Sequence, residues 1–426
     1  MKILHISALP IWSMDGKGGM PSLRETLKGH IKAGHDINII LPRYDLFSDD
    51  LKPLCIQEGY EYSIHVAPCG WLPMVKRFRN RISKISGRNS IPYPVRWAIN
   101  ISMFFLLTLS LLIQAIKVYQ QRKLKPDLVY AHNQYASLAG FLLGRLWKIP
   151  NVTRLYGTFL ADLMKKPFVF FRYPTAAVGY IVPSTLLICA NDGTRGDEVA
   201  QKFKIPAKRF RFWQNGIEPP SKKPTINRSN LVCCFGANLR QESKWVVSCS
   251  RLSSWKRIDR MLNALSVCRH KGLDCQLLIA GDGPEREALE QLASKLGIAA
   301  DIVWFGSVAH EDIWAMMNLA DVFMITNDVT NRCNPLYEAA WAGCPVVSVI
   351  DPSTSDLLRH GINALLAEKE DTETLGNYLA ELLSDGDLQK KFQIEQKKLA
   401  AMFWTWEERM QVEVKELEKI VFTHRN

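Results

Sequence analysis

Short apolar segments that favour β-strands alternate with segments that favour α-helices along this chain, and the alternation occurs twice. The strands expected in the first half are residues 2–7, 35–42, 127–132, 151–157, 186–191 and 209–216. The strands expected in the second half are residues 245–252, 275–281, 301–306, 321–326 and 345–349. Strands separated by helices are typical of βαβ units, which form parallel sheets. The pattern predicts an α/β protein with two tandem Rossmann-like domains, and we expect a ligand site in a cleft between them, beyond the carboxyl ends of the strands.

The alternation stops at residues 218–244, which begin with a polar, proline-rich segment and are interpreted as an interdomain linker region. A chain of 426 residues is also too long for a single hydrophobic core. We therefore predict an N-terminal Rossmann-like domain at residues 1–217 and a C-terminal one at residues 245–402. We expect residues 403–426 to form a helix that crosses back to the N-terminal domain.

The positive charge of the chain is concentrated in its first half. The net charge is +12, and residues 1–217 hold 30 Lys and Arg against 13 Asp and Glu, whereas residues 218–426 are mildly acidic. A basic half suggests an anionic partner, with a solvated surface that binds nothing as the alternative. Charge alone would also suit a nucleic-acid-binding protein, but no motif supports that class, so we expect no nucleic-acid partner.

The cysteines and the first residues bear on cellular location. Ten cysteines include no C-x-x-C pair and no Cys/His cluster at metal-binding spacing, which suits free thiols in a reducing cytoplasm. Met1 leads directly into the first expected strand, so we expect no secretory signal. The expected location is cytoplasmic, either free or peripheral at the inner face of the membrane.

Two segments raise the question of membrane contact. Residues 97–116 are uncharged and long enough to span a bilayer. A buried core helix, a helix at the membrane edge and a true span remain open, although a span would place strands of one sheet on opposite sides of the membrane. Residues 71–88 carry six basic residues, no acidic residue and interleaved apolar residues. This pattern is typical of a helix on anionic lipid, with an ordinary solvated helix or loop as the alternative.

Two loops that follow expected strands are candidate phosphate sites, because helix starts after parallel strands attract anions. The sequence GKGGMP (16–21) allows a ligand to approach the backbone closely, unless it is simply a flexible loop. The sequence SRLSSWKRID (250–259) places Arg251 and Lys256 five residues apart across a loop. Two such cations can clamp a diphosphate, although ordinary surface charge is the simpler explanation of the pair by itself.

A third candidate is the predicted helix at residues 334–342, which is followed by Gly343 and a short buried strand. Asn334 suits the N-cap and Pro335 suits the first helical position. Glu338 is expected in the first turn of this otherwise apolar helix, where free N–H groups could also bind an anion.

Signatures of several other enzyme classes are absent from the sequence. It contains no Walker A sequence, no H-E-x-x-H and no G-x-S-x-G. The GKGG stretch is not a full G-x-G-x-x-G fingerprint, which disfavours a Rossmann dehydrogenase. The one D-x-D, Asp385 to Asp387, lies in a late polar loop and is interpreted as a turn. No residue pattern requires a metal, so we expect no metal and no cofactor.

Taken together, these stretches resemble a retaining glycosyltransferase of family 4, whose GT-B fold has two Rossmann-like domains with a cleft between them. The matching stretches, in the family's order, are GKGGMPSLRETLKGHIKAGHDINIILP, PDLVYAH, FWQNGIE, SRLSSWKRID, AGDGPE, VWFGSV, ADVFMIT and NPLYEAAWAGCPVV. The resemblance implies that a nucleoside-diphosphate sugar binds mainly to the C-terminal domain and the acceptor mainly to the N-terminal domain. It also implies that no metal is needed.

The resemblance assigns roles to individual residues. Arg251 and Lys256 would be the catalytic cations, which hold the diphosphate and stabilise its growing charge. Glu338 would bind the ribose hydroxyls. The other donor-binding contacts would be the N–H groups near Cys333 and Asn334 at the phosphates, Val308 at the base, and Gly18 and Gly19 closing over the phosphates from the other domain.

Two positions depart from the family pattern. The family usually has two glutamates separated by seven residues, but Thr330 stands where the first would precede Glu338, so recognition of the donor sugar is altered. Asp328 is close enough in sequence to substitute. A histidine usually ends the strand that here ends in Tyr156, so a phenol replaces it near the transferred sugar. Neither change forbids transfer, because retaining transfer needs diphosphate stabilisation more than a protein base.

The predicted function is metal-independent transfer of a hexosyl or pentosyl group from a UDP- or GDP-linked sugar to a hydroxyl acceptor. The acceptor would be a glycan, as a polysaccharide intermediate, or a lipid-linked intermediate, and an anionic membrane surface could be contacted through residues 71–88. The alternative is a catalytically inactive protein of the same fold that binds sugar nucleotides without turnover.

Overall fold

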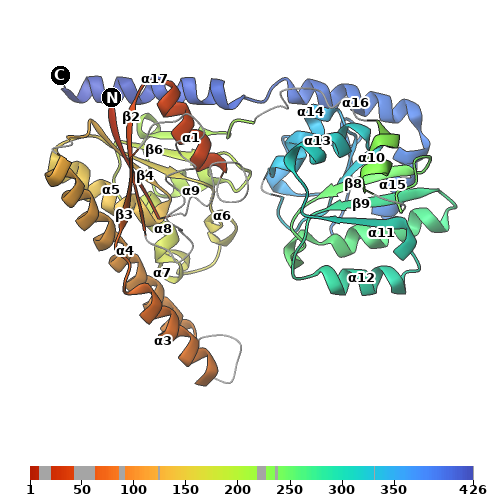
Figure 1. Ribbon diagram of the computed structural model, residues 1–426, viewed down its shortest axis with the longest axis horizontal. Helices are drawn as coiled ribbons and strands as arrows, with labels where there is room; N and C mark the ends of the chain where they lie inside the picture. Colours follow the sequence, from red (N-terminus) through yellow and green to blue (C-terminus); the bar gives the residue numbers. More distant parts are fainter. Residues whose placement is uncertain are drawn as a thin grey trace. The chain divides into compact units, whose positions relative to one another are not determined.

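The computed structural model describes residues 1–8, 21–42, 63–85, 92–122, 125–217, 227–235, 238–330 and 332–425. The chain divides into two compact units, the first made of Met1–Gly216 with Trp406–Asn426 and the second of Ile217–Thr405. Each unit contains one sheet whose neighbouring strands all run parallel, with helices around it (Figure 1). The predicted fold class, two Rossmann-like α/β domains in tandem, is confirmed.

The first unit is built on a sheet with the strand order β3-β2-β1-β4-β5-β6-β7. Its strands are β1 Lys2–Ser7, β2 Asp36–Pro42, β3 Ser63–Ala67, β4 Leu128–His132, β5 Asn151–Leu155, β6 Leu186–Ala190 and β7 Phe210–Trp213. Every residue of β4, β5 and β6 is buried, as expected for parallel strands covered on both faces. The sequence did not predict β3, which is short and has exposed as well as buried positions.

Helices cover both faces of this sheet. They are α1 Pro21–Lys32, α3 Leu72–Ile85, α4 Tyr93–Arg122, α5 Gln134–Trp147, α6 Leu160–Leu163, α7 Val169–Arg172, α8 Pro174–Ile181, α9 Gly196–Lys202 and α17 Trp406–Arg425, with a short 3₁₀ turn η1 at Ala207–Arg209. Alternate residues of β1 point into different cores: Ile3 packs with α1 and α17, whereas Leu4 packs with α4 and α5. The last helix of the chain, α17, is therefore a structural part of the first unit.

Helix α4 contains the long apolar segment and packs by one face only. Among the described residues, Tyr93–Gln121 is long and apolar enough to cross a membrane, with a mean hydropathy of 2.1 over an 18-residue stretch within it. Leu107 and Leu111 are buried against the sheet side, whereas Phe105 and Leu109 are more than half exposed. The strands before and after α4 belong to one sheet, so the helix packs along the domain, and its exposed face leaves the membrane-edge interpretation open.

The second unit is built on a sheet with the order β10-β9-β8-β11-β12-β13. Its strands are β8 Lys244–Cys249, β9 Cys275–Ala280, β10 Ile302–Gly306, β11 Val322–Ile325, β12 Val346–Val349 and β13 Ala364–Ala367. Its helices are α10 Arg228–Phe235, α11 Ile258–His270, α12 Arg286–Lys295, α13 His310–Leu319, α14 Asn334–Ala342, α15 Thr372–Ser384 and α16 Gly386–Ala400. Short 3₁₀ turns lie at η2 Ser254–Lys256, η3 Ala299–Asp301 and η4 Pro352–Thr354.

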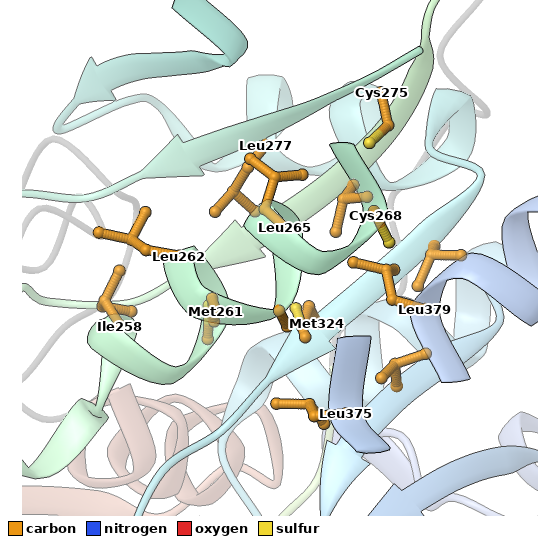
Figure 2. Close-up of a cluster of buried hydrophobic side chains, with 14 of the residues drawn as sticks. Ile258, Met261, Leu262, Leu265, Cys268, Cys275, Leu277, Met324, Leu375 and Leu379 are labelled. Carbon is orange, nitrogen blue, oxygen red and sulfur yellow. The ribbon is translucent and has the colours of Figure 1, made fainter. Parts of the chain in front are cut away.

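The core on one face of the second sheet is organised by α11. The side chains of this helix that point inward are Ile258, Met261, Leu262, Leu265 and Cys268, and Figure 2 shows them facing β9, β11 and α15. Their spacing of three or four residues places them on one stripe of the helix. Helix α15 approaches α11 closely at Gly376, where a Cβ atom would lie 2.5 Å from the Cβ of Val267. This packing holds the end of β8 and the loop before α11 in place.

Part of the predicted linker region belongs to the second unit. Within residues 218–244, helix α10 buries Leu231 in the core. The Arg228 guanidinium lies 4.5 Å from the centroid of the Trp245 ring and pairs with Asp321 at 2.6 Å. The polar sequence did not indicate this helix. Arg228 is held by Trp245 and Asp321, which lie far from it in the sequence, and the local pattern does not reveal such contacts.

Candidate functional site

The predicted donor-binding residues of the second unit gather at one edge of its sheet. Arg251 follows β8, Val308 follows β10, and Asp328 and Thr330 follow β11. Because all strands of this sheet are parallel, their carboxyl ends lie at the same edge. The start of α14, with Glu338 in its second turn, comes after the same β11 loop.

Lys256 is a buried cation at this edge, with 8% of its surface exposed. Its Nζ lies 4.1 Å from the centroid of the Trp255 ring. The Asn327 side chain, in the orientation that satisfies both of its polar groups, accepts from Lys256 Nζ at 3.1 Å and donates to Lys256 O at 3.2 Å. Burial lowers the pKa of Lys256. No ion pair joins Lys256 to a carboxylate in the part of the chain that the structure describes, so this site is suited to an anion from outside.

Arg251 lies on the same loop and is exposed. The loop is held by the glycine turn after β9, where Leu252 N donates to Asp282 O at 3.0 Å. A Cβ atom at Gly281 would lie 1.9 Å from Ser250 O, and one at Gly283 would lie 2.2 Å from Leu252 O. The AGDG turn therefore serves to bring the backbone close to the loop that carries Arg251.

Helix α14 begins at Asn334, but two details of its predicted start are wrong. The N-cap is Cys333, not Asn334, and the side chain of Cys333 makes no capping hydrogen bond. Glu338 is the fifth helical residue, so it lies in the second turn and not in the first. The helix ends, as predicted, before Gly343, which is left-handed with φ of 72°. A start without a side-chain cap leaves N–H groups available to an anion.

Lys256 and Glu338 both influence the pKa values of two buried thiols, Cys333 and Cys249. Burial raises the pKa of the Cys333 thiol, the positive charge of Lys256 opposes that shift, and the charge of Glu338 adds to it. Burial also raises the pKa of Cys249, at the end of β8, to about 12, with a further contribution from Glu338. Glu338 itself is only 5% exposed. Lys256 and Glu338, the two charged residues assigned to the donor, therefore act with opposite sign on the same two thiols.

The positions that depart from the family pattern have defined surroundings. Thr330 is 1% exposed, its backbone N donates to Asp351 Oδ2 at 2.6 Å, and its hydroxyl has no hydrogen-bond partner among the described residues. The carboxylate of Asp328 is instead paired with Arg260 at 2.9 Å and with Arg257 at 3.4 Å. Asp328 is therefore neutralised by arginines, which weakens the idea that it replaces the missing glutamate.

Gly18 and Gly19 lie outside the described residues. Val308 is partly buried and packs against the core on its side of the sheet. Asp385 accepts from the N–H groups of Asp387 and Leu388 at 3.0 Å and 2.9 Å, so it serves as the N-cap of α16.

Tyr156 belongs to the first unit and directly follows β5. Its Oη lies 2.6 Å from Nδ1 of His132 at the end of β4, and its ring lies under the Arg154 guanidinium at 5.4 Å. Burial raises the pKa of Tyr156, although the charge of Arg154 opposes the shift. Sequence reasoning missed His132, together with Trp255 and Asn327 in the second unit. Only the position of His132 at the end of an expected strand could have pointed to it.

Two family models match most of the chain between them. The model described as "Glycosyltransferase Family 4" matches residues 18–220, and the model described as "Glycosyl transferases group 1" matches residues 235–399.

Curated relatives and solved structures agree with these matches. The 2-deoxystreptamine N-acetyl-D-glucosaminyltransferase of Niallia circulans is 20% identical over 279 residues, which cover 62% of this chain and 70% of that protein. A GDP-mannose-dependent alpha-(1-6)-phosphatidylinositol monomannoside mannosyltransferase of Mycobacterium tuberculosis is 28% identical over 173 residues, 39% of this chain and 45% of that protein. The crystal structure of Anabaena HepE in complex with UDP is 18% identical, with a TM-score of 0.66 over 98% of this chain and 100% of that one.

The fold and the family matches together define a glycosyltransferase of the GT-B class. Within that class, the chain belongs to glycosyltransferase family 4.

Proposed function

We propose that this protein transfers a sugar from a UDP- or GDP-linked donor to a hydroxyl acceptor, with retention of configuration and without a metal. The observation that carries the proposal is the buried Lys256, whose neighbours Trp255 and Asn327 are neutral. A buried ammonium group without a carboxylate partner is costly, and a bound anion removes much of that cost. A diphosphate is the anion that a family 4 glycosyltransferase would place there.

Negative charge develops on the leaving diphosphate during transfer. Residues that stabilise this charge in the transition state therefore raise the rate. Lys256 supplies a compact charge and Arg251 a guanidinium fork, and the uncapped start of α14 adds N–H groups. These groups would perform the charge neutralisation that a divalent ion performs in other enzymes. The leaving phosphate would then take the proton of the attacking hydroxyl, which removes the need for a protein base.

Glu338 is proposed to bind the ribose of the nucleotide. A buried carboxylate accepts strong hydrogen bonds from a pair of hydroxyls. The choice between UDP and GDP stays open, since the mycobacterial relative is named for GDP-mannose and the Anabaena structure contains UDP.

We further propose a lipid-linked or polysaccharide acceptor and peripheral binding to the cytoplasmic face of a membrane. One relative is named for a phosphatidylinositol mannoside. In the first unit, Met74 and Phe78 of the basic helix α3 are more than half exposed, and Figure 1 shows this helix extending away from the sheet.

Two apolar residues of the 71–88 segment pack against the first unit. Leu72 is 5% exposed, and Trp71 Nε1 donates to Ser110 Oγ on α4 at 3.1 Å. These two residues attach α3 to the domain, and Leu72 is too deeply buried to reach lipid. Among the side chains that the structure describes, those that are large, apolar and exposed on this proposed membrane surface include Met74 and Phe78 on α3 and Phe105, Leu109 and Ile113 on α4.

The experiment that tests the proposal is a turnover assay with the purified full-length chain and a panel of UDP- and GDP-sugars. Release of the nucleoside diphosphate would be measured by coupled assay, and the anomeric configuration of any product by NMR. We expect release from at least one donor, loss of that release in Lys256→Ala, and an anomeric configuration that matches the donor. Tight nucleotide binding without turnover of any donor would instead indicate the inactive, sugar-nucleotide-binding alternative.

A further inference from the structure

A pocket of about 330 Å³ lies in the first unit between the start of α4 and the segment that joins α7 to α8. Its lining includes two arginines and three aromatic rings but no carboxylate, and none of the residues assigned to the sugar donor belongs to it. A volume of this size is at the lower end of the range for ligand pockets, which suits a small polar group. We call it the α4–α7 pocket.

Two hydrogen bonds from α4 to α7 hold the walls of the pocket. Trp97 Nε1 donates to Phe171 O at 2.9 Å, and Tyr93 Oη donates to Arg172 O at 2.9 Å. Both aromatic side chains line the pocket. Because they are tied to the backbone of α7, the pocket is a fixed part of the first unit.

Arg96 and Arg172 bring two positive charges to the pocket. The Arg96 guanidinium lies 5.9 Å from the centroid of the Tyr93 ring, and the Arg172 guanidinium lies 5.2 Å from the same centroid. Neither arginine forms an ion pair with a carboxylate in the part of the chain that the structure describes. An aromatic ring holds a cation in place without neutralising it. Two such cations in one pocket therefore favour an anionic ligand, and guanidinium forks match the oxygens of a phosphate.

The segments around the pocket are also free of negative charge. Residues 62–126 contain no Asp or Glu, and residues 163–191 contain none either. Two exposed lysines, Lys165 and Lys166, precede α7. The positive potential thus extends over the surface around the pocket, where it attracts anions.

A row of apolar side chains continues from the pocket along α4. Side chains four residues apart are neighbours on a helix. The row with this spacing consists of Trp97, Ile101, Phe105, Leu109 and Ile113. The first two residues line the pocket, and each of the last three is half or more exposed. The pocket therefore lies at one end of an exposed apolar surface.

The α7 side of the pocket is apolar and exposed as well. Phe168, directly before α7, is 83% exposed, and Phe171 within α7 is 69% exposed. A free phosphate would leave these side chains in water. The acyl chains of a lipid would cover them, which favours a phosphate that is carried by a lipid.

We propose that the α4–α7 pocket binds the phosphate group of an anionic membrane phospholipid, with Arg96 and Arg172 as its phosphate-binding residues. The inference rests on the proposed function for the membrane location and goes beyond it by assigning a headgroup site. The basic helix α3 attracts any anionic surface through its net charge. The pocket adds recognition of the phosphate itself, through guanidinium groups that can each donate two parallel hydrogen bonds.

The test is binding to phosphatidylcholine vesicles that contain phosphatidylglycerol, measured without sugar nucleotide. A double variant with Arg96→Lys and Arg172→Lys keeps the net charge but loses both guanidinium forks. We expect its partition coefficient to fall about tenfold, because a point charge cannot replace a bidentate contact. The control is Arg145→Lys, an exposed arginine of α5 outside the pocket, which should bind as the wild-type protein does. Wild-type partitioning of the double variant would overturn the proposal.

A soluble phosphate ester distinguishes a lipid headgroup from a free ligand. We expect sn-glycerol 3-phosphate, added at constant ionic strength, to compete with the vesicles for the wild-type protein, because it carries the same phosphate without acyl chains. Binding of this ester by a wild-type protein that binds no vesicle would overturn the assignment to lipid.

Vesicle binding and donor turnover separate this proposal from the proposed function. A protein that binds vesicles through the two arginines but releases no nucleoside diphosphate from any donor would support the pocket and overturn the proposed transfer. A protein that turns over a donor but whose double variant binds vesicles as well as the wild-type protein does would support the transfer and overturn the pocket.

Discussion

The ammonium group of Lys256 lies over the ring of its sequence neighbour Trp255, 4.1 Å from the ring centroid. An aromatic face attracts a cation and keeps it in place, but it does not neutralise the charge as a carboxylate would. With 8% of the residue exposed, Lys256 is a desolvated cation whose charge is left for a ligand.

Replacing either cation of the β8 loop should remove most of the transfer activity. Lys256→Ala and Arg251→Ala each delete a group preorganised toward the leaving diphosphate, and the loss of one such group costs about 10²–10³ in rate. Initial rates at saturating donor would be measured beside Lys295→Ala, which removes an exposed lysine of the same unit. Wild-type turnover in both loop variants would show that the phosphate site has been assigned to the wrong residues.

Glu338→Gln should weaken nucleotide binding more than it slows the chemical step. The amide keeps one acceptor oxygen but loses the charge that strengthens the bonds to two ribose hydroxyls, a difference of about 1–3 kcal/mol. Titration calorimetry with free UDP and GDP measures this directly, and Glu373→Gln, an exposed carboxylate on α15, is the control. An affinity equal to that of the wild-type protein would show that Glu338 does not bind the ribose.

Turnover should not depend on a divalent metal. Arg251, Lys256 and the start of α14 supply the positive charge that a metal would otherwise bring to the diphosphate. Rates would be compared in buffer, in excess EDTA, and after Mg²⁺ or Mn²⁺ is added back. Complete loss of activity in EDTA with recovery on addition of either metal would overturn this part of the account.

The protein should bind anionic vesicles reversibly through α3. Each basic residue near an anionic surface contributes about 1 kcal/mol, and the attraction decays within a Debye length. Co-sedimentation at low and high salt would measure binding, with Lys76, Arg77, Arg79 and Arg81 changed to Glu in one variant.

A second variant, with Phe105, Leu109 and Ile113 changed to Ser, separates charge from apolar contact with α4. Binding lost with the charge reversal and with salt fits docking on the surface. Binding that persists in molar salt, or that is equal on neutral vesicles, would contradict it and indicate insertion of the apolar face of α4. No binding to any vesicle would contradict the peripheral location.

Much of the second unit could be predicted because its signals are local. Buried strands such as β9 are continuous apolar runs, and the spacing of Arg251 and Lys256 across one loop is visible in the sequence. The end of α14 at Gly343 was equally visible. Its exact start was not, because Cys333 and Asn334 compete for the cap and the backbone of the preceding loop decides between them.

Long-range contacts account for most of what the sequence did not reveal. His5, His30 and Glu413 lie on β1, α1 and the last helix of the chain, and only the topology of the first unit brings them together. The indole N–H of Trp71 donates to Ser110, 39 residues away, a contact that the local pattern of residues 71–88 does not indicate. The strand β3 is short and only partly buried, so its alternation of apolar and polar residues was too weak to indicate a strand.

The most direct test of the central claim is the thermal stability of the full-length protein in the presence of UDP, GDP, ADP and their sugars. A ligand that binds only the native state raises stability by mass action, by about 2.7 kcal/mol at a concentration one hundred times its Kd. We expect UDP or GDP to raise the Tm of the wild-type protein, and we expect the shift to be lost in Lys256→Ala but kept in Lys295→Ala. No shift with any nucleoside diphosphate, or an equal shift in Lys256→Ala, would contradict it.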